Sequence, residues 1–291
     1  MPVRIRLCGQ LVVERDGHEL ADRALGSRKG RLLFQLLAAQ RGRLVPTERI
    51  ADVLWGDTQP RDAAANVATL VSRLRSVLGD DVIAGSRAAY GLLPKGAWVT
   101  DVDAARQLVA EAADRQRAGE PGLAYVAATR ANDLLGEHDG LVELPSDDWV
   151  SPLRDEIRGL RRTARHLGAV SATQTGDRQA ARALAGAAVA ADSLDEQAYR
   201  DLMTALAADG ESATALAAYA DLQRTLRREL GIDPTGTPER STSRSCAAAN
   251  RQPRHRYVRT RTGPKAGCSA DPTRSPRCAT PGRRRSQGSR P

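Results

Sequence analysis

Apolar residues occupy every second position of segment 3–7 and recur at Leu11 and Val13. This period of two is typical of strands that bury one face. Asp16-Gly17 supplies a turn, and Glu19-Leu20 can begin a returning strand. The pattern therefore predicts a small antiparallel sheet at the start of the chain.

Three amphipathic helices are predicted between this sheet and residue 80. The first has Ser27 as its N-cap and ends at Gly42, and the second has Thr47 as its N-cap and ends at Gly56. The third runs from about Asp62 to Leu78, with Val and Leu residues along one face.

A β-hairpin with a basic tip is predicted next. Val82-Ile83 and Ala89–Leu93 are strand-like pieces, and Gly85-Ser86-Arg87 joins them. A sheet, three helices and a hairpin follow one another in the order of a winged helix. Residues 1–100 are therefore predicted to form a winged helix-turn-helix domain.

The next part of the chain has only helical patterns. Its Ala- and Leu-rich amphipathic segments cover roughly 103–118, 121–135, 150–174, 177–190, 195–208 and 211–230. Short Gly-containing joints pair these segments at about the 34-residue spacing of tetratricopeptide-like repeats. The predicted fold is mainly α with a small β component: the winged helix, then an all-α repeat domain over residues 101–239.

The formal charge of +9 is distributed unevenly along the chain. Residues 1–100 hold 15 basic and 10 acidic residues, and residues 101–239 hold 15 and 24. Residues 240–291 hold 14 basic residues, one acidic residue and few large apolar ones, so we expect them to be disordered. The excess basicity thus belongs to the C-terminal tail.

The sequence offers no chemistry for an enzyme, a metal or a cofactor. Its four histidines, His18, His138, His166 and His255, are scattered without predicted partners. Only Cys8 precedes the tail, and the tail cysteines lack metal-ligand spacing. Trp55 and Trp149 are interpreted as packing residues, and Trp98 is left unassigned. No apolar run approaches the roughly 20 residues of a membrane helix, so a cytoplasmic protein is expected.

Short motifs follow one another along residues 1–239. Those of the first half are Arg4–Gly9, Arg28–Leu33, Ile50–Gly56, Val71–Arg75 and Tyr90–Leu92. Those of the second half are Leu194–Met203, Ala217–Tyr219 and Glu229–Pro234. In this order and spacing the chain resembles the SARP family of actinobacterial pathway activators, in its short class. That family joins an OmpR-type winged helix to a bacterial transcriptional activator domain.

The resemblance implies a sequence-specific activator that controls a secondary-metabolite gene cluster. It implies double-stranded DNA with promoter direct repeats as one partner, and RNA polymerase with its σ factor as another. It further implies a homodimer on DNA. A helical-repeat scaffold that binds only proteins, or a truncated and partly defective regulator, remains the alternative.

The third helix would enter the major groove, so its polar face supplies the candidate DNA contacts. These candidates are Asn66, Thr69, Ser72, Arg73 and Arg75, with Arg87 at the wing tip. Arg73 and Arg75 are interpreted as phosphate clamps rather than base readers. The family commonly has Asn where this chain has Ala65, so base specificity is not carried over. The alternative is an ordinary solvated helix face.

The resemblance stops after Asp233-Pro234, where the family continues into another amphipathic helix. The Arg-, Pro- and Ser-rich composition that follows is what a GC-rich gene yields when it is translated out of frame. The sequence therefore leaves two interpretations of the tail: a frameshifted product, or a basic arm that adds nonspecific DNA affinity.

Overall fold

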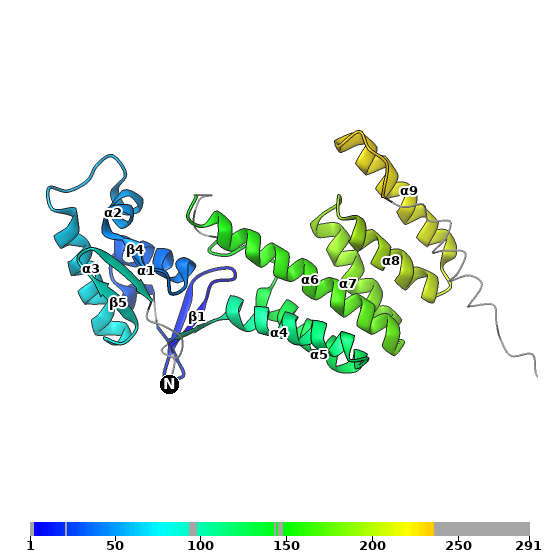
Figure 1. The fold of residues 1–291 in the computed structure, drawn as a ribbon, viewed down its shortest axis with the longest axis horizontal. Helices are drawn as coiled ribbons and strands as arrows, with labels where there is room; N and C mark the ends of the chain where they lie inside the picture. Colours follow the sequence, from blue (N-terminus) through cyan, green and yellow to red (C-terminus); the bar gives the residue numbers. More distant parts are fainter. Residues whose placement is uncertain (1–2, 21, 93–97, 143, 145–147, 236–291) are drawn as a thin grey trace, which may run out of the picture. The chain divides into compact units, whose positions relative to one another are not determined.

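The computed structural model describes residues 3–20, 22–92, 98–142, 144 and 148–235 (Figure 1). Its strands are β1 (Val3–Arg6), β2 (Val12–Arg15), β3 (His18–Leu20), β4 (Val45–Pro46), β5 (Ile83–Ser86), β6 (Ala89–Leu92) and β7 (Trp98–Thr100). The helices before β7 are the short 3-10 helix η1 (Asp22–Leu25), α1 (Arg28–Gln40), α2 (Thr47–Trp55) and α3 (Ala63–Leu78). Those after it are α4 (Asp101–Arg117), α5 (Pro121–Leu135), α6 (Ser151–Thr175), α7 (Arg178–Ala191), α8 (Glu196–Ala208) and α9 (Ser212–Glu229).

The first sheet has the strand order β3-β2-β1-β7. The predicted antiparallel pairing is confirmed, with Ile5 opposite Val13, and both of these alternating side chains are buried. The prediction missed β7, which pairs in parallel with β1 and places Trp98 opposite Val3. Three residues are too short a run to show a period of two.

The second sheet is the wing, with the order β4-β6-β5. The predicted hairpin is confirmed, but Gly85 and Ser86 belong to β5 rather than to the joint between the strands. Gly85 has a φ of +107°, and a Cβ atom there would lie 2.1 Å from the carbonyl oxygen of Ala89. Only glycine therefore allows β5 to approach β6 so closely.

The predicted ends of α1 and α3 are largely confirmed, whereas the predicted cap of α2 is wrong. The amide of Gly30 donates to Ser27 Oγ, as expected for an N-cap. Thr47 is not the N-cap of α2, because Pro46 holds that position without a side-chain hydrogen bond. The Thr47 hydroxyl instead donates to the carbonyl oxygen of Arg87 at 2.7 Å. Tertiary contact with the hairpin has replaced the local cap.

Helices α4 to α9 form the predicted all-helical part, and each packs against the next (Figure 1). Small residues allow close approach: a Cβ atom on Gly168 of α6 would lie 2.8 Å from Leu184 of α7. Buried alanines fill the contacts between α4, α5 and α6. The predicted fold class, a winged helix followed by helical repeats, is confirmed.

One apolar core continues from the first sheet into the helical part. It contains residues of β1, α1 and α3 together with Val102 of α4 and Leu153 and Ile157 of α6. Trp98 and Trp149 are both buried in it, which confirms Trp149 as a packing residue. The described residues of both halves accordingly lie in one compact unit.

Polar contacts hold the backbone just after β1 within this core. The carboxylate of Asp101 accepts the amides of Leu7 and Cys8, each at 2.9 Å. In addition, the amide of Leu141 donates to the carbonyl of Leu7, and the amide of Gly9 donates to the carbonyl of Asp139. Segment 139–142 thus pairs with segment 7–9, and Asp101 pairs with the same segment from α4.

Arg154 of α6 holds segment 139–142 in turn. Its guanidinium donates to the carbonyl oxygens of Gly140, Leu141 and Leu144 at 2.7 to 2.9 Å. This side chain is buried, so the hydrogen bonds are shielded from competition by water. Arg154 thus adds three hydrogen bonds to the backbone pairing that holds this irregular segment.

A charge network joins the end of α1 to the helical part. Glu156 of α6 accepts hydrogen bonds from Arg41 and from Arg106 of α4. Burial by itself raises the pKa of Glu156, but the hydrogen bonds from the two arginines outweigh burial and lower that pKa. Glu156 is therefore held in its ionised form.

His166 has a partner, contrary to the sequence prediction. Its Nδ1 lies 2.6 Å from Oδ2 of the buried Asp201, so α6 and α8 are joined by this pair. The two residues are 35 positions apart, and sequence spacing therefore gave no sign of the contact. The hydrogen bond to Asp201 raises the pKa of His166, although partial burial opposes that rise.

The predicted disordered tail, residues 240–291, lies outside the described residues. Within the described part of the chain, no helix is both long and apolar enough to cross a membrane.

Replacing Asp101 should destabilise the whole described unit rather than α4 alone. Asp101→Ala leaves the buried amides of Leu7 and Cys8 without an acceptor, which should lower the free energy of unfolding by about 3 kcal/mol. Urea denaturation checks this value. Asp103→Ala, on the same turn of α4, is the control and should cost clearly less. Equal losses in the two variants would contradict the role given to Asp101.

Stability should depend on pH through His166. Because its pKa is raised in the folded state, the stabilisation is complete below the unfolded value of about 6.5 and is lost as pH rises through the folded value. The difference in unfolding free energy between the wild type and His166→Gln should thus be larger at roughly pH 5.5 than at roughly pH 8.5. His138→Gln is the control. A difference that grows with pH would refute this account.

Candidate nucleic-acid interface

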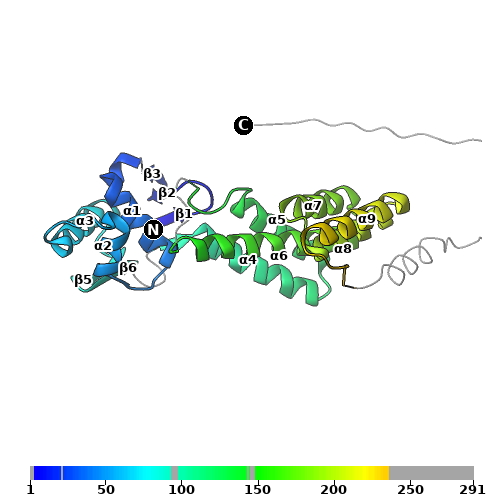
Figure 2. The same ribbon diagram turned by 90° about the horizontal axis from the view of Figure 1, so that it is seen from above.

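Helix α3 is held by one face and exposes the other. Asp62 caps its start by accepting the amide of Ala65 at 2.8 Å. Val67, Val71, Leu74 and Leu78 are buried against the rest of the winged helix. Figure 2 shows α1, α2 and α3 grouped with the β5–β6 hairpin. This packing leaves the opposite face of α3 open.

The exposed face carries most of the predicted contacts. Asn66, Thr69, Ser72 and Arg73 are all exposed. The Asn66 amide nitrogen donates to the carbonyl of Asp62, and the Thr69 hydroxyl donates to the carbonyl of Ala65. Among the described residues, the Arg73 guanidinium has no ion pair or hydrogen bond. Arg73 is therefore available to an external anion.

Arg75 is placed differently from Arg73. It lies in the last turn of α3 and is half-buried. Its Nε and Nη2 donate to the carbonyl of Ile83, and Nη2 also donates to that of Gly85. Its guanidinium further lies over the ring of Tyr90, 6.0 Å from the ring centroid. The structure thus brings Arg75 onto the wing, away from the exposed row of α3.

The wing tip is formed by Arg87 and Ala88, between β5 and β6. Arg87 is exposed, and its carbonyl accepts the Thr47 hydroxyl. The amide of Thr47 donates to the carbonyl of Ala88 at 2.9 Å. The backbone of the tip is therefore fixed to the start of α2, while the side chain of Arg87 remains at the surface.

Sequence reasoning missed the contacts that Thr47 and Tyr90 make in the wing. A buried threonine at a helix start has the sequence signal of an N-cap, and its contact with a hairpin 40 positions away leaves no local trace. Trp55 was expected in the core and is half-buried against it, with Lys29 Nζ 4.7 Å from its ring centroid. A face of the Trp55 ring is thus covered by the Lys29 ammonium.

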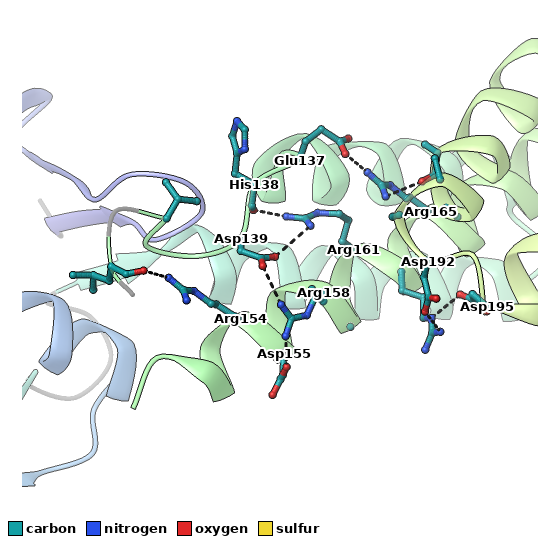
Figure 3. A pocket seen from close by; sticks show the side chains of 18 residues that line it. Glu137, His138, Asp139, Arg154, Asp155, Arg158, Arg161, Arg165, Asp192 and Asp195 are labelled. Atoms are coloured by element: carbon teal, nitrogen blue, oxygen red, sulfur yellow. Dashed lines mark hydrogen bonds and ion pairs between the residues drawn. The ribbon is translucent and has the colours of Figure 1, made fainter. Parts of the chain in front are cut away.

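A second candidate is a cleft of about 1180 Å³ in the helical part (Figure 3). Its arginines lie on one face of α6 and are Arg154, Arg158, Arg161, Arg162 and Arg165. Its carboxylates are Glu137, Asp139, Asp155, Asp192 and Asp195. The lining thus holds five charges of each sign.

The arginines of this cleft are largely occupied within the protein. Arg161 donates to the carbonyls of Leu135 and His138, and Arg165 pairs with Glu137 at 2.5 Å. Burial and the neighbouring charge of Arg165 both lower the pKa of Arg161. These contacts hold α6 to the end of α5 and to the segment after it, so the two arginines stabilise the fold.

Within the described residues, no three His, Cys, Asp or Glu side chains gather as a metal site. Burial, and next the charge of Asp101, raise the pKa of the Cys8 thiol far above its usual value. The thiol is therefore held protonated, which makes it a poor nucleophile or ligand.

Family models match both halves of the chain. Residues 23–88 match "Transcriptional regulatory protein, C terminal", and residues 100–242 match "Bacterial transcriptional activator domain". The chain is 33% identical over 214 residues to the regulatory protein AfsR of Streptomyces griseus, covering 72% of this chain and 21% of AfsR. It therefore spans about a fifth of the length of that relative.

Two further comparisons agree with this assignment. The regulatory protein DnrI of Streptomyces peucetius is 29% identical over 250 residues, covering 80% of this chain and 88% of DnrI. The solved structure of Mycobacterium tuberculosis EmbR, in complex with a low-affinity phosphopeptide, matches with a TM-score of 0.74 and 24% identity. That match covers 84% of this chain and 65% of the EmbR chain, and it supports the fold.

The fold and both matched models define a transcriptional regulator with an OmpR-type winged helix and an activator domain. Within that class, the chain belongs to the SARP family.

Proposed function

We propose that this protein is a sequence-specific DNA-binding activator that recruits RNA polymerase to promoters. The observation that carries the proposal is the exposed polar face of α3 beside a wing whose tip presents Arg87, in a chain that matches both domain models. A helix of this kind fits the major groove, and a wing beside it can reach flanking phosphate. The family membership supports a secondary-metabolite gene cluster as the target.

The proposed contacts divide by chemistry. Asn66, Thr69 and Ser72 carry short polar groups that can read base edges. Arg73 and Arg87 are exposed cations and would bind phosphates. Arg75 belongs to the same proposed interface by its place on α3, but its guanidinium already contacts the wing.

The proposed partners of the helical part rest on the family membership. The σ factor and neighbouring subunits of RNA polymerase would contact α4 to α9, and two copies of the chain would bind direct repeats in DNA. Residues 101–239 hold 15 basic and 24 acidic residues, which suits a protein partner better than DNA. Cytoplasmic location and the lack of enzymatic activity are parts of the same proposal.

Selection from a random pool of DNA duplexes tests DNA binding and supplies a probe. On that probe, Arg73→Ala and Arg87→Ala should each weaken binding about fivefold, as expected for losing one phosphate contact. Each should reduce the slope of log K against log salt by about 0.9. Fluorescence anisotropy over a series of salt concentrations measures both.

Thr69→Ala and Asn66→Ala should instead change which duplexes are selected while leaving the salt slope as it is. Arg117→Ala removes an exposed arginine of α4 and is the matched control, expected to bind like the wild type. No selection of any duplex by the wild-type chain would reject the proposal and favour a scaffold that binds only proteins.

Activation should require the later helices although DNA binding does not. A chain that ends at Gly176 keeps α4 to α6, which complete the first core, and lacks α7 to α9. It should occupy the selected site with unchanged affinity but fail to stimulate transcription by purified RNA polymerase. Circular dichroism confirms that it is folded. Full activation by this shorter chain would remove α7 to α9 from the proposed polymerase contact.

A further inference from the structure

Strand β5 is an edge strand of the wing. The sheet order is β4-β6-β5, so β5 pairs with β6 on one side and, within the part of the chain that the structure describes, with no strand on the other. Alternate carbonyls of a strand point to the same edge. The carbonyls of Ile83 and Gly85, two positions apart in β5, therefore point to one edge. An unpaired edge both loses hydrogen bonds and leaves the strand free to shift.

Arg75 contacts these two carbonyls together. Nε and Nη2 lie 3.0 and 2.9 Å from the oxygen of Ile83, and Nη2 lies 3.2 Å from that of Gly85. A guanidinium is a rigid planar fork, so it can bridge two acceptors in a fixed relation. Arg75 thereby links β5 to the last turn of α3 through hydrogen bonds.

The guanidinium of Arg75 lies over an aromatic ring, and the residue is half-buried. Tyr90, 3% exposed, lies opposite Gly85 in the hairpin and presents its ring to the guanidinium. Arg73, two residues earlier, is exposed and makes no such contact among the described residues. Two arginines of one helix therefore have different environments.

We propose that Arg75 is a positioning residue that sets the wing against α3, so that Arg87 reaches DNA when Asn66 and Thr69 lie in the major groove. This inference rests on the proposed DNA-binding function. It assigns the wing contact to Arg87 and the placement of the wing to Arg75. Thr47 fixes the tip of the same hairpin to α2.

The distinguishing substitution is Arg75→Lys. Lysine keeps the positive charge, but its single ammonium cannot reproduce the planar fork between Ile83 and Gly85. A phosphate clamp tolerates this change, whereas a positioning fork does not. Arg75→Lys should therefore weaken binding to the selected duplex about as much as Arg87→Ala does, about fivefold.

A double-mutant cycle separates action through the wing from direct contact. Once Arg87→Ala has removed the wing contact, adding Arg75→Lys should cause no further loss. In the double variant Arg73→Ala/Arg87→Ala, the two fold-losses of affinity should instead multiply, because the two phosphate contacts are independent. Ethylation interference should show the same flanking phosphates lost in Arg75→Lys and in Arg87→Ala, with the major-groove contacts retained.

Two outcomes would overturn the inference. In the first, Arg75→Lys binds like the wild type, whereas Arg75→Gln loses affinity and this loss multiplies with that of Arg87→Ala. Arg75 would then be a direct phosphate contact. In the second, the loss of affinity in Arg75→Lys multiplies with the losses in both Arg73→Ala and Arg87→Ala. The substitution of Arg75 would then act through a general effect on folding.

Amide exchange tests the same inference without DNA. The amides of β5 and β6 should exchange faster in Arg75→Lys and in Arg75→Gln than in the wild type, and those of β1 and β2 should not. Unchanged exchange in the wing would refute the positioning role. Failure of the wild-type chain to bind any duplex would reject the proposed function, whereas this measurement would still decide whether Arg75 holds the wing.

Discussion

The backbone of residues 7–9 is the point on which the described unit depends. Asp101 of α4 accepts hydrogen bonds from the amides of Leu7 and Cys8, and segment 139–142 pairs with the same backbone. Arg154 then holds segment 139–142 to α6. These residues are about a hundred positions apart in sequence, so their joining closes a long loop, and the buried apolar core around them supplies the free energy that closure costs. The winged helix is thereby completed by residues of the helical part.

Arginine has a recurring structural use in this chain. Arg154 contacts three backbone carbonyls near α6, Arg161 contacts two, and Arg75 contacts two in the wing. In each place the backbone is irregular, ends a helix or lies at a sheet edge, and the guanidinium supplies donors to its carbonyls. A count of basic residues therefore overstates the charge available to DNA, because only exposed arginines such as Arg73 and Arg87 can bind phosphate at little cost.

The sequence was sufficient to predict the helices and the order of the winged helix, because their apolar periods are long and their ends carry Gly, Ser or Asp. Contacts between distant segments could not be predicted in the same way. Thr47 has the local signal of an N-cap yet donates to Arg87, and His166 has no near partner in sequence yet pairs with Asp201. Arg75 stands in the same polar face pattern as Arg73, and only the position of β5 distinguishes the two. Strand β7 was missed because three residues show no period.

Helix α6 belongs to more than one core, and this determines how the two halves of the chain are joined. Leu153 and Ile157 lie in the core of the winged helix, Ala164 and Leu167 pack with α4 and α5, and Ala172 packs with α7 and α8. A continuous helix of 25 residues resists bending, since each turn is hydrogen-bonded to the next. The winged helix and the helical repeats are therefore joined through the packed side chains of α6. Within the described unit, α4 and α6 thus share the core of the winged helix, and the packing continues across the predicted boundary between residues 100 and 101.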